Sequence, residues 1–372
     1  MNRFVRIYLI PGAIMQSVMI GGGYGTGREV IEFFTHFGIW GGMLSMGVAT
    51  VCIAIVFSLS LEISRVFQVY DYRNFFKILL GRAWFLYEIL VVILFMLVIA
   101  VIGAAAGTIV RDELGLPSYF GIAIMLVAVV TINFFGRLFL TRIFAFWSIF
   151  LYMVFSAYLV SVFMHFPDEI SEAFSIPTIE PGWFVSGLQY SFYNVTAIPI
   201  ILYAVRGIET RKEAVGAGVI GALIAVVPAL MLHLSFAADF PEVLETSLPV
   251  YHIFNSLNMP VLKLLYLLVL FGTFIETGAG NIQGFLERLD NWRQENDKEK
   301  LSRIVHSLIA IFAVGLAGGL SSLGIVSLIA EGYGTIAWGF MIVYVIPLLT
   351  IGVYKIIKAG DSRRHHKPSV NV

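Results

Sequence analysis

Long apolar runs recur along the whole chain and restrict the folds that it can adopt. Many of them reach the roughly 20 residues that an α-helix needs to cross a bilayer. Inside lipid the backbone finds no water, so each such run must bond its own amides and carbonyls as a helix. The composition agrees, with 59% hydrophobic residues, 13% charged residues and a mean hydropathy of +0.88. The sequence therefore predicts an all-α transmembrane protein.

Ten transmembrane helices are predicted from these runs and from the breaks between them. Their approximate spans are 7–34, 39–64, 84–110, 119–135, 139–165, 184–205, 214–236, 260–286, 303–319 and 335–357. The basic and aromatic residues 65–82 are typical of an amphipathic helix at the membrane interface. Residues 238–260 are acidic and contain prolines, which indicates a helical hairpin over the outer face. We expect one polytopic transporter domain over residues 1–372, in which residues 358–372 form a cytoplasmic tail.

The basic residues set the expected orientation. With the amino terminus in the cytoplasm, all of the 24 Lys and Arg residues except Arg28, Arg111 and Lys263 fall on the cytoplasmic side. Losing or adding one span would scramble this partition, so both termini are expected inside. The chain is thus predicted to be an integral, multi-pass protein of a bacterial-type plasma membrane. Its expected partners are the lipid bilayer and a small-molecule substrate, and its oligomeric state stays open.

Sequence signatures of an enzyme or of a metal protein are missing. The chain has no Walker loop, no HExxH spacing and no nucleophile constellation in its polar segments. The single cysteine, Cys52, lies in an apolar run and is most simply a buried hydrophobic residue. We therefore expect no catalytic residues, no cofactor, no nucleic-acid partner and no bound metal, with Na⁺ as the one exception that stays open.

Residues 21–27, GGGYGTG, lie inside the first predicted span. Glycine favours conformations outside the helix and leaves amides and carbonyls exposed, which the bilayer tolerates only where the segment lines a cavity. Close packing of helices through small residues is the alternative explanation. Three adjacent glycines and two more exceed what a packing stripe of every fourth residue needs, so we expect the helix to be unwound here.

The sixth predicted span contains a second candidate break, in YSFYNVTAIPIILY (residues 190–203). Pro199 lacks an amide donor, clashes with the carbonyl of Val195 and biases Ile198 away from the helix. Asn194 lies at the same depth and can bond the freed backbone groups or face a ligand. A simple proline kink is the alternative.

The two breaks would stand at matching positions of two halves of five spans each, about 7–165 and 184–357. Because five is odd, the second half enters from the opposite side, which predicts inverted repeats with discontinuous helices 1 and 6 around a midplane site. This arrangement resembles the amino acid-polyamine-organocation (APC) superfamily with its leucine-transporter-type fold. The opening GGGYGTGREVIEFF is similar to that of the YkvI-type membrane proteins. The resemblance implies an alternating-access secondary transporter for a small polar metabolite, often an amino acid.

The breaks supply the expected substrate site. Amides at a new helix N-terminus attract an anion and carbonyls at a new C-terminus attract a cation, so a zwitterionic amino acid can bind both. We expect its carboxylate on the glycine loop and its ammonium on Asn194 and the carbonyls of helix 6. Tyr190 and Tyr193 are expected either to line the pocket or to be core residues. The predicted substrate-binding residues are Gly21, Gly22, Gly23, Tyr24, Gly25, Thr26, Tyr190, Tyr193, Asn194 and Thr196.

Glu276, in LFGTFIETGAGNIQGF, is the most informative charge of the chain. It follows Pro260 by about 24 Å of helix, which places it well inside the hydrocarbon. Acids there are rare and functional by default. Glycines recur at every fourth position around it, so it is expected to point into the bundle. A structural ion pair with Arg28 is the alternative.

Ion coupling is the function expected of Glu276. By the resemblance, a sodium ion lies between carbonyls of helix 1 and hydroxyl side chains of helix 8. The predicted ion-coupling residues are Met19, Gly22, Thr273, Glu276 and Thr277. A carboxylate in place of a hydroxyl leaves Na⁺ and H⁺ both open, because a carboxyl group in a site without water can itself carry the coupling proton.

The resemblance also implies an extracellular gate between Arg28, which follows the first break, and Glu331. Pairing of Arg28 with Glu29 or Glu32 along the helix is the alternative. Other functions stay open as well: a channel or a ligand-sensing membrane protein that uses the same pocket, or a transporter of organic cations.

Overall fold

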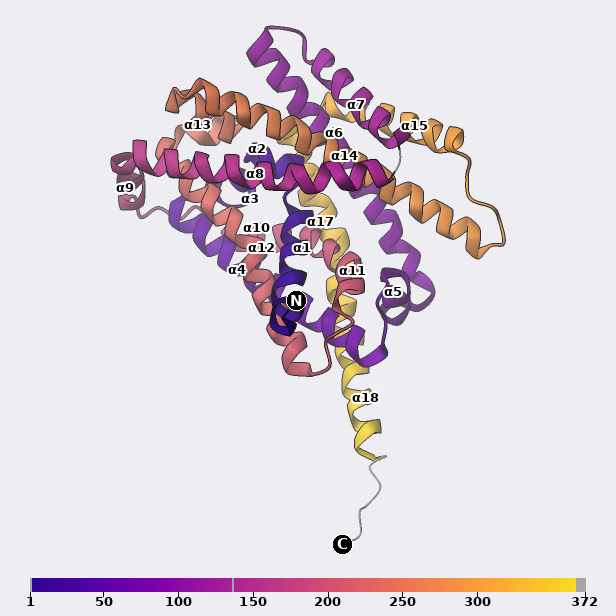
Figure 1. Ribbon diagram of the computed structural model, residues 1–372. Helices are drawn as coiled ribbons and strands as arrows, with labels where there is room; N and C mark the ends of the chain where they lie inside the picture. Colours follow the sequence, from indigo (N-terminus) through magenta and orange to yellow (C-terminus); the bar gives the residue numbers. More distant parts are fainter. Residues whose placement is uncertain (1, 136, 366–372) are drawn as a thin grey trace.

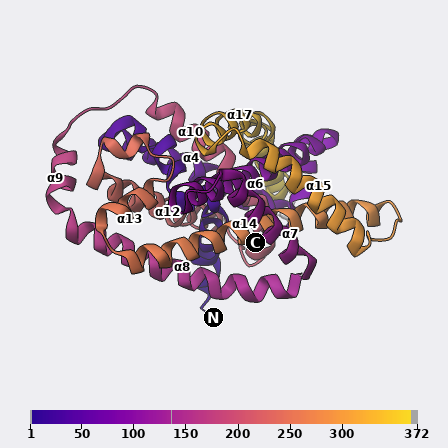
Figure 2. The same cartoon turned by 90° about the horizontal axis from the view of Figure 1, so that it is seen from above.

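The chain is helical throughout the part that the structure describes. The structure is a computed structural model, and it describes residues 2–135 and 137–365. Within these ranges it contains no strand, which confirms the all-α prediction. Figure 1 shows α1 in the middle of the molecule, and Figure 2 shows the same helices from above.

The first part of the chain forms one broken helix, three long helices and two shorter ones. Its elements are η1 (Val5–Leu9), α1 (Ile10–Met19), α2 (Gly22–Thr26), α3 (Arg28–Phe33), η2 (Thr35–Phe37), α4 (Gly38–Phe67), α5 (Tyr72–Leu80), η3 (Gly81–Trp84), α6 (Phe85–Leu114), α7 (Ser118–Phe135) and α8 (Arg137–His165).

The second part begins with a short helix and ends with a long segmented one. Its elements are α9 (Pro167–Ser175), α10 (Trp183–Asn194), η4 (Val195–Ala197), α11 (Ile198–Ile201), η5 (Leu202–Val205), α12 (Arg211–Phe236), η6 (Ala237–Asp239), η7 (Glu242–Glu245), α13 (Pro249–Leu257), α14 (Pro260–Glu295), α15 (Arg303–Ser321), α16 (Ile325–Ser327), η8 (Leu328–Tyr333), α17 (Gly334–Phe340), η9 (Met341–Val345), η10 (Leu348–Gly352) and α18 (Val353–His365).

Seven helical segments of the described chain are long and apolar enough to cross a membrane. An eighth is added if Phe150–His165 and Pro167–Ser175, which meet at 78°, form one span. Two further apolar helices, Val5–Met19 and Ser118–Ile132, are shorter. The chain is therefore a multi-pass integral membrane protein. Helix covers most of each of the ten predicted spans, but the count of ten stays a prediction.

Glycines let the central helices approach one another closely. Helix α4 packs against α12 and α10, and α1 packs against α12. A Cβ added to Gly12 of α1 would lie 2.8 Å from the Cα of Gly221 of α12. A Cβ added to Gly218 would lie 2.5 Å from the backbone nitrogen of Ser58 in α4. Backbone therefore packs directly against backbone at these crossings, so even a methyl group has no room.

The predicted amphipathic segment at 65–82 contains helix α5. The side chain of Asp71 caps its amino terminus by accepting from the amide of Asn74 at 2.8 Å. Its apolar face is buried, and the ring of Phe76 stacks on Tyr87 of α6 with centroids 3.7 Å apart. The helix in this segment is confirmed, and its buried face holds it against α6.

The predicted acidic hairpin at 238–260 consists of η7 and α13, which precede α14. The hydroxyl of Tyr251 in α13 donates to Glu113 at the end of α6, and Lys263 forms an ion pair with the same carboxylate. These contacts tie the hairpin to α6 and α14. Helices α8 and α14 then run side by side across the molecule (Figures 1 and 2).

We predict that Gly218→Ala destabilises the protein by about 1–3 kcal/mol, because the added methyl group must push apart the backbones of α12 and α4. Gly47→Ala is the matched control on α4, because no atom from another part of the described chain lies within 4 Å of a Cβ added there. Thermal unfolding of purified protein in detergent measures both. Equal midpoints for the two variants would contradict the close contact.

Candidate functional site

Helix 1 is broken at Ile20 and Gly21, where the glycine segment begins, but Gly22–Thr26, which were expected to be unwound, form the short helix α2. Helix α1 ends at Met19, Ile20 has ψ 73°, and Gly21 is extended with φ −93° and ψ −172°. The amide of Gly21 donates to the carbonyl of Met19 at 2.8 Å and not to a residue four positions back, so the α-helical pattern stops there. A second irregularity follows at Gly27, whose φ of 84° separates α2 from α3.

The glycines of this segment also permit close packing, the alternative explanation for them. A Cβ added to Gly25 would lie 3.0 Å from Leu270 of α14, and one added to Gly27 would lie 2.9 Å from Val250 of α13. Positive φ at Gly27 would be strained for any other residue. The break and the packing therefore occur together: α2 is a short helix pressed against α14.

Helix 6 is not unwound, so the prediction that it is discontinuous is wrong. Asn194, Val195, Ala197 and Ile198 all have right-handed helical dihedrals. The helix only tightens into the 3₁₀ segment η4 before Pro199, which occupies the first turn of α11. In particular, Ile198 keeps φ −59° and ψ −48° in spite of the following proline.

The backbone carbonyls before Pro199 keep hydrogen-bond partners, through a 3₁₀-type backbone bond and through a side chain. The amide of Ile198 donates to the carbonyl of Val195. The hydroxyl of Tyr87, from α6, donates to the carbonyl of Thr196 at 3.1 Å. That carbonyl therefore keeps a partner although the regular ladder is disturbed. A contact from a distant helix thus keeps the segment helical, which the local sequence does not reveal.

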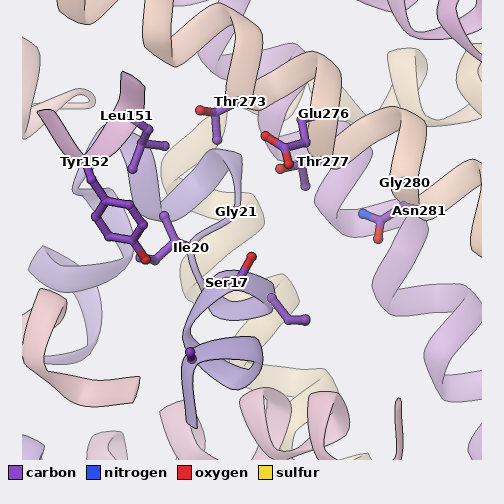
Figure 3. A pocket seen from close by; sticks show the side chains of 12 residues that line it. Ser17, Ile20, Gly21, Leu151, Tyr152, Thr273, Glu276, Thr277, Gly280 and Asn281 are labelled. Carbon is purple, nitrogen blue, oxygen red and sulfur yellow. The ribbon is translucent and has the colours of Figure 1, made fainter. Parts of the chain in front are cut away.

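The break in helix 1 opens onto a cavity of about 420 Å³, here called the Glu276 cavity. It lies between α1, α8 and α14, and Figure 3 shows Thr273, Glu276 and Thr277 of α14 on the side facing Gly21. Its lining residues are Ala13, Ser17, Val18, Ile20, Gly21, Leu151, Tyr152, Thr273, Glu276, Thr277, Gly280 and Asn281. Main chain of the break and a carboxylate therefore border the same space.

Thr277 faces Gly21 across this cavity. A Cβ added to Gly21 would lie 3.5 Å from Cγ2 and 3.9 Å from Oγ1 of Thr277. Thr273, one turn earlier, is buried and donates to the carbonyl of Val269 at 2.9 Å. Of the predicted ion-coupling residues, Thr273, Glu276 and Thr277 thus line this cavity beside Gly21, whereas Met19 lines the neighbouring one.

Glu276 has no ion-pair or hydrogen-bond partner among the residues that the structure describes. The alternative of a structural pair with Arg28 is wrong, because Arg28 binds elsewhere. Its guanidinium donates to Glu32 at 2.9 Å and to the carbonyls of Leu244 and Thr246 at 3.0 Å. Glu276 therefore keeps a carboxyl group that can exchange an ion or a proton with the cavity.

A smaller cavity of about 110 Å³ adjoins the first and is here called the Glu29 cavity. The two cavities share Val18, Gly21, Thr277 and Asn281. The smaller one lies between the break, α6, helix 6 and η8. Its lining includes seven predicted site residues, namely Met19, Gly21, Gly23, Tyr193, Asn194, Thr196 and Thr277. Asn194 also donates to the carbonyl of Tyr190 at 2.9 Å, and Thr196 donates to that of Tyr193 at 2.6 Å.

The lining residues that were not predicted from the sequence include Glu29, Asn281 and Tyr333. Glu29 and Tyr333 line the Glu29 cavity, and Asn281 lines both. Glu29 is only 5% exposed and accepts a hydrogen bond from the hydroxyl of Tyr193 at 2.7 Å. The available signal for Glu29 was its position directly after GGGYGTGR, but the sequence analysis treats Glu29 only as a possible ion-pair partner of Arg28. Asn281 follows Thr277 by one turn of α14. Because residues four apart share a face of a helix, its position beside the cavity could have been predicted from that of Thr277.

Four other predicted substrate residues, Tyr24, Gly25, Thr26 and Tyr190, line neither cavity, and the surroundings of Gly22 lie outside what the structure describes. Tyr24 faces a third cavity beside Tyr152 and Pro228, and its hydroxyl has no hydrogen bond in the described chain. Thr26 is buried and bonds the carbonyl of Gly23 at 2.6 Å, so it stabilises the turn. Tyr190 packs on Phe34 with ring centroids 4.6 Å apart, which agrees with the alternative explanation that it is a core residue. Gly25 contributes a carbonyl to the hydroxyl of Tyr266, and Gly22 begins α2.

The predicted gate between Arg28 and Glu331 is wrong in this structure. Arg28 is 6% exposed and forms its ion pair with Glu32, which was the alternative. Glu331 lies in η8 and lines a separate cavity with Leu90, Leu97 and other residues of the α6 side. Arg28 and Glu331 therefore do not face each other. On η8, Tyr333 rather than Glu331 points toward helix 6, where its ring packs near that of Tyr193.

The comparisons with known proteins agree with this architecture. The chain is 22% identical over 283 residues to "Uncharacterized membrane protein YkvI" of Bacillus subtilis (strain 168), and the match covers 74% of this chain and 78% of that protein. No protein-family model matches the chain.

Three solved structures are similar in fold. MhsT in complex with L-phenylalanine matches with a TM-score of 0.55 and 13% identity, over 97% of this chain and 98% of that one. A Na⁺-coupled sialic acid symporter in a substrate-bound outward-open state matches at 0.51 and 11%, over 93% and 87%. Mhp1, a nucleobase-cation-symport-1 family transporter, matches at 0.51 and 16%, over 88% and 76%. At these identities the likeness shows the fold alone, which is the leucine-transporter-type fold.

We predict that Tyr87→Phe lowers the stability by about 1–3 kcal/mol, because the buried carbonyl of Thr196 then loses its hydroxyl donor. Tyr203→Phe is the control: Tyr203 lies on the same span as Thr196 and is 60% exposed. Thermal unfolding in detergent compares the two. An unchanged midpoint for Tyr87→Phe would mean that helix 6 does not need this donor.

Proposed function

We propose that the chain is a secondary active transporter, which moves a small polar metabolite by alternating access in symport with Na⁺ or H⁺. The metabolite class is an amino acid or a related amine. One observation supports this most directly: the main chain of helix 1 leaves its helical bonding at Ile20 and Gly21, where two adjoining cavities meet. Backbone that leaves the helical pattern inside a bilayer is tolerated where it lines a cavity or binds a solute or an ion.

The proposed topology has ten spans in two inverted repeats of five, with both termini in the cytoplasm and membership of the APC superfamily. The described helices are compatible with it if the two halves of helix 1 are counted as one span. Helix 6 would then begin the second repeat without unwinding, and its contribution would come from Tyr193, Asn194 and Thr196 on the cavity wall. The two repeats would differ in this respect.

Glu276 is the proposed coupling group. Its carboxylate, the hydroxyl of Thr277 and the backbone near Gly21 are oxygen ligands of the type that hard cations prefer. A proton on Glu276 is the second possibility, because nothing described in the cavity compensates its charge. The similarity in fold to a Na⁺-coupled symporter supports coupling to a cation in general.

Counterflow tests transport against a channel or a purely ligand-sensing protein. Purified protein is reconstituted in liposomes that are preloaded with unlabelled L-alanine, and uptake of labelled L-alanine is followed with and without Na⁺ at two external pH values. A carrier accelerates the uptake and saturates. Uptake that is linear in concentration and indifferent to preloading would indicate a channel, and no flux for any amino acid or amine would contradict the transport proposal.

We predict that Glu276→Gln abolishes the dependence of uptake on the ion gradient while the protein still folds, because the amide can neither bind Na⁺ as a charge nor carry a proton. Glu331→Gln is the matched control, since it removes a carboxylate that lines neither cavity. The measurement is gradient-driven uptake beside counterflow. Gradient-driven uptake that is the same for Glu276→Gln and wild type would assign coupling to another residue.

A further inference from the structure

The proposed function leaves Glu29 without a role. Gly27, with φ 84°, turns the chain between α2 and α3, and the two charged residues that follow it diverge. Arg28 reaches Leu244, Thr246 and Glu32, whereas Glu29 lines the Glu29 cavity. A buried carboxylate is therefore placed at the break in helix 1 with its neighbouring arginine engaged elsewhere.

The surroundings of Glu29 leave its charge uncompensated. Its Oε2 accepts from the hydroxyl of Tyr193, and its Oε1 lies against Gly23, where an added Cβ would collide with it. No described residue forms an ion pair with it. Among the residues that the structure describes, no Lys, Arg or His lines either cavity, whereas Glu276 brings a second carboxylate to the larger one. A charge buried without a counterion is costly, so this site favours a cationic guest.

Aromatic side chains indicate what kind of cation fits. The rings of Tyr193 and Tyr333 lie with centroids 5.0 Å apart, and both line the cavity together with Phe95. Aromatic faces attract organic ammonium groups, whereas a metal ion prefers several oxygen, nitrogen or sulfur ligands. In the described chain no group of three or more His, Cys, Asp or Glu residues is placed to hold a metal ion.

We propose that Glu29 binds the ammonium group of the transported solute, so that the substrate class is a compact primary amine, amino acids included. The inference rests on the proposed function and deepens it. The ammonium group occupies the Glu29 cavity of about 110 Å³, and the rest of the solute extends past Gly21 and Thr277 into the Glu276 cavity. This placement differs from the sequence expectation, in which Asn194 and the carbonyls of helix 6 receive the ammonium.

Matched pairs of probes test the proposal on the purified full-length protein in detergent. L-Alanine is compared with L-lactate, and n-propylammonium with n-propanol, by isothermal titration calorimetry and thermal shift. Each pair differs by an ammonium against a hydroxyl group. We expect the ammonium members to bind and the hydroxyl members to bind at least tenfold more weakly. Equal binding within both pairs, or no binding of either ammonium probe, would overturn the proposal.

Variants of the carboxylate separate its charge from its structural contribution. Glu29→Gln should weaken ammonium binding by about 10- to 100-fold, because a charge-assisted hydrogen bond is lost. Glu29→Asp keeps the charge and should retain the preference for ammonium. Glu32→Gln is the matched control one turn later on α3, because Glu32 pairs with Arg28 and lines neither cavity. Wild-type affinity in Glu29→Gln would overturn the assignment.

Gly23→Ala gives an independent test if Glu29→Gln fails to fold. The added methyl group would displace the Glu29 carboxylate without removing its charge, so ammonium binding should fall while unfolding stays cooperative. Undiminished ammonium binding in this variant would contradict the proposed contact. If Glu29→Gln binds ammonium normally and loses only the pH dependence of uptake, Glu29 carries protons and the proposal is overturned. If the variants behave as expected but wild type shows no counterflow, the binding site stands and the transport function fails.

Discussion

The demand that every backbone amide and carbonyl in a bilayer finds a partner governs this structure. Helices α4, α6, α12 and α14 meet it internally, and glycine contacts then bring their backbones together. Helix 6 satisfies this requirement with a side chain from another helix, because the hydroxyl of Tyr87 donates to the carbonyl of Thr196 near the proline. Helix 1 alone among these departs from helical bonding, at Ile20 and Gly21. The two cavities that carry uncompensated carboxylates adjoin this departure, so the site exists where the backbone requirement is relaxed.

The sequence predicted the helices and the break in helix 1 because both follow from local properties. Apolar length fixes a spanning helix, and the glycines of GGGYGTG permit the extended conformation at Gly21 and the left-handed one at Gly27 that interrupt it. The state of helix 6 was not predictable in this way. Pro199 is a local signal for a break, but the donor that prevents it, Tyr87, comes from another helix 109 residues away from Thr196. At helix 6 the local preference set by Pro199 was overruled by this tertiary contact.

Glu29 was missed for a related reason. Along an ideal helix, Arg28 and the acids at 29 and 32 are neighbours, and their charges are expected to neutralise one another. Only the pair with Glu32 forms. The left-handed residue Gly27 sets the direction in which α3 leaves, and with it the cavity that Glu29 reaches. The predicted gate failed similarly, because a resemblance in fold does not place an individual side chain: Glu331 and Tyr333, two residues apart, line different cavities.

The glycine contact between α1 and α12 has a mechanical consequence. Gly12 and Gly221 lock the first half of helix 1 onto α12, whereas Gly27 at the start of α3 abuts Val250 of the hairpin helix α13. Each half is thus fastened to its own support, and only the extended linkage at Ile20 and Gly21 joins them. That linkage has the properties of a hinge: Gly21 is extended and its amide bonds Met19 instead of a residue four positions back, so the dihedral angles can change there while the bodies on both sides stay rigid.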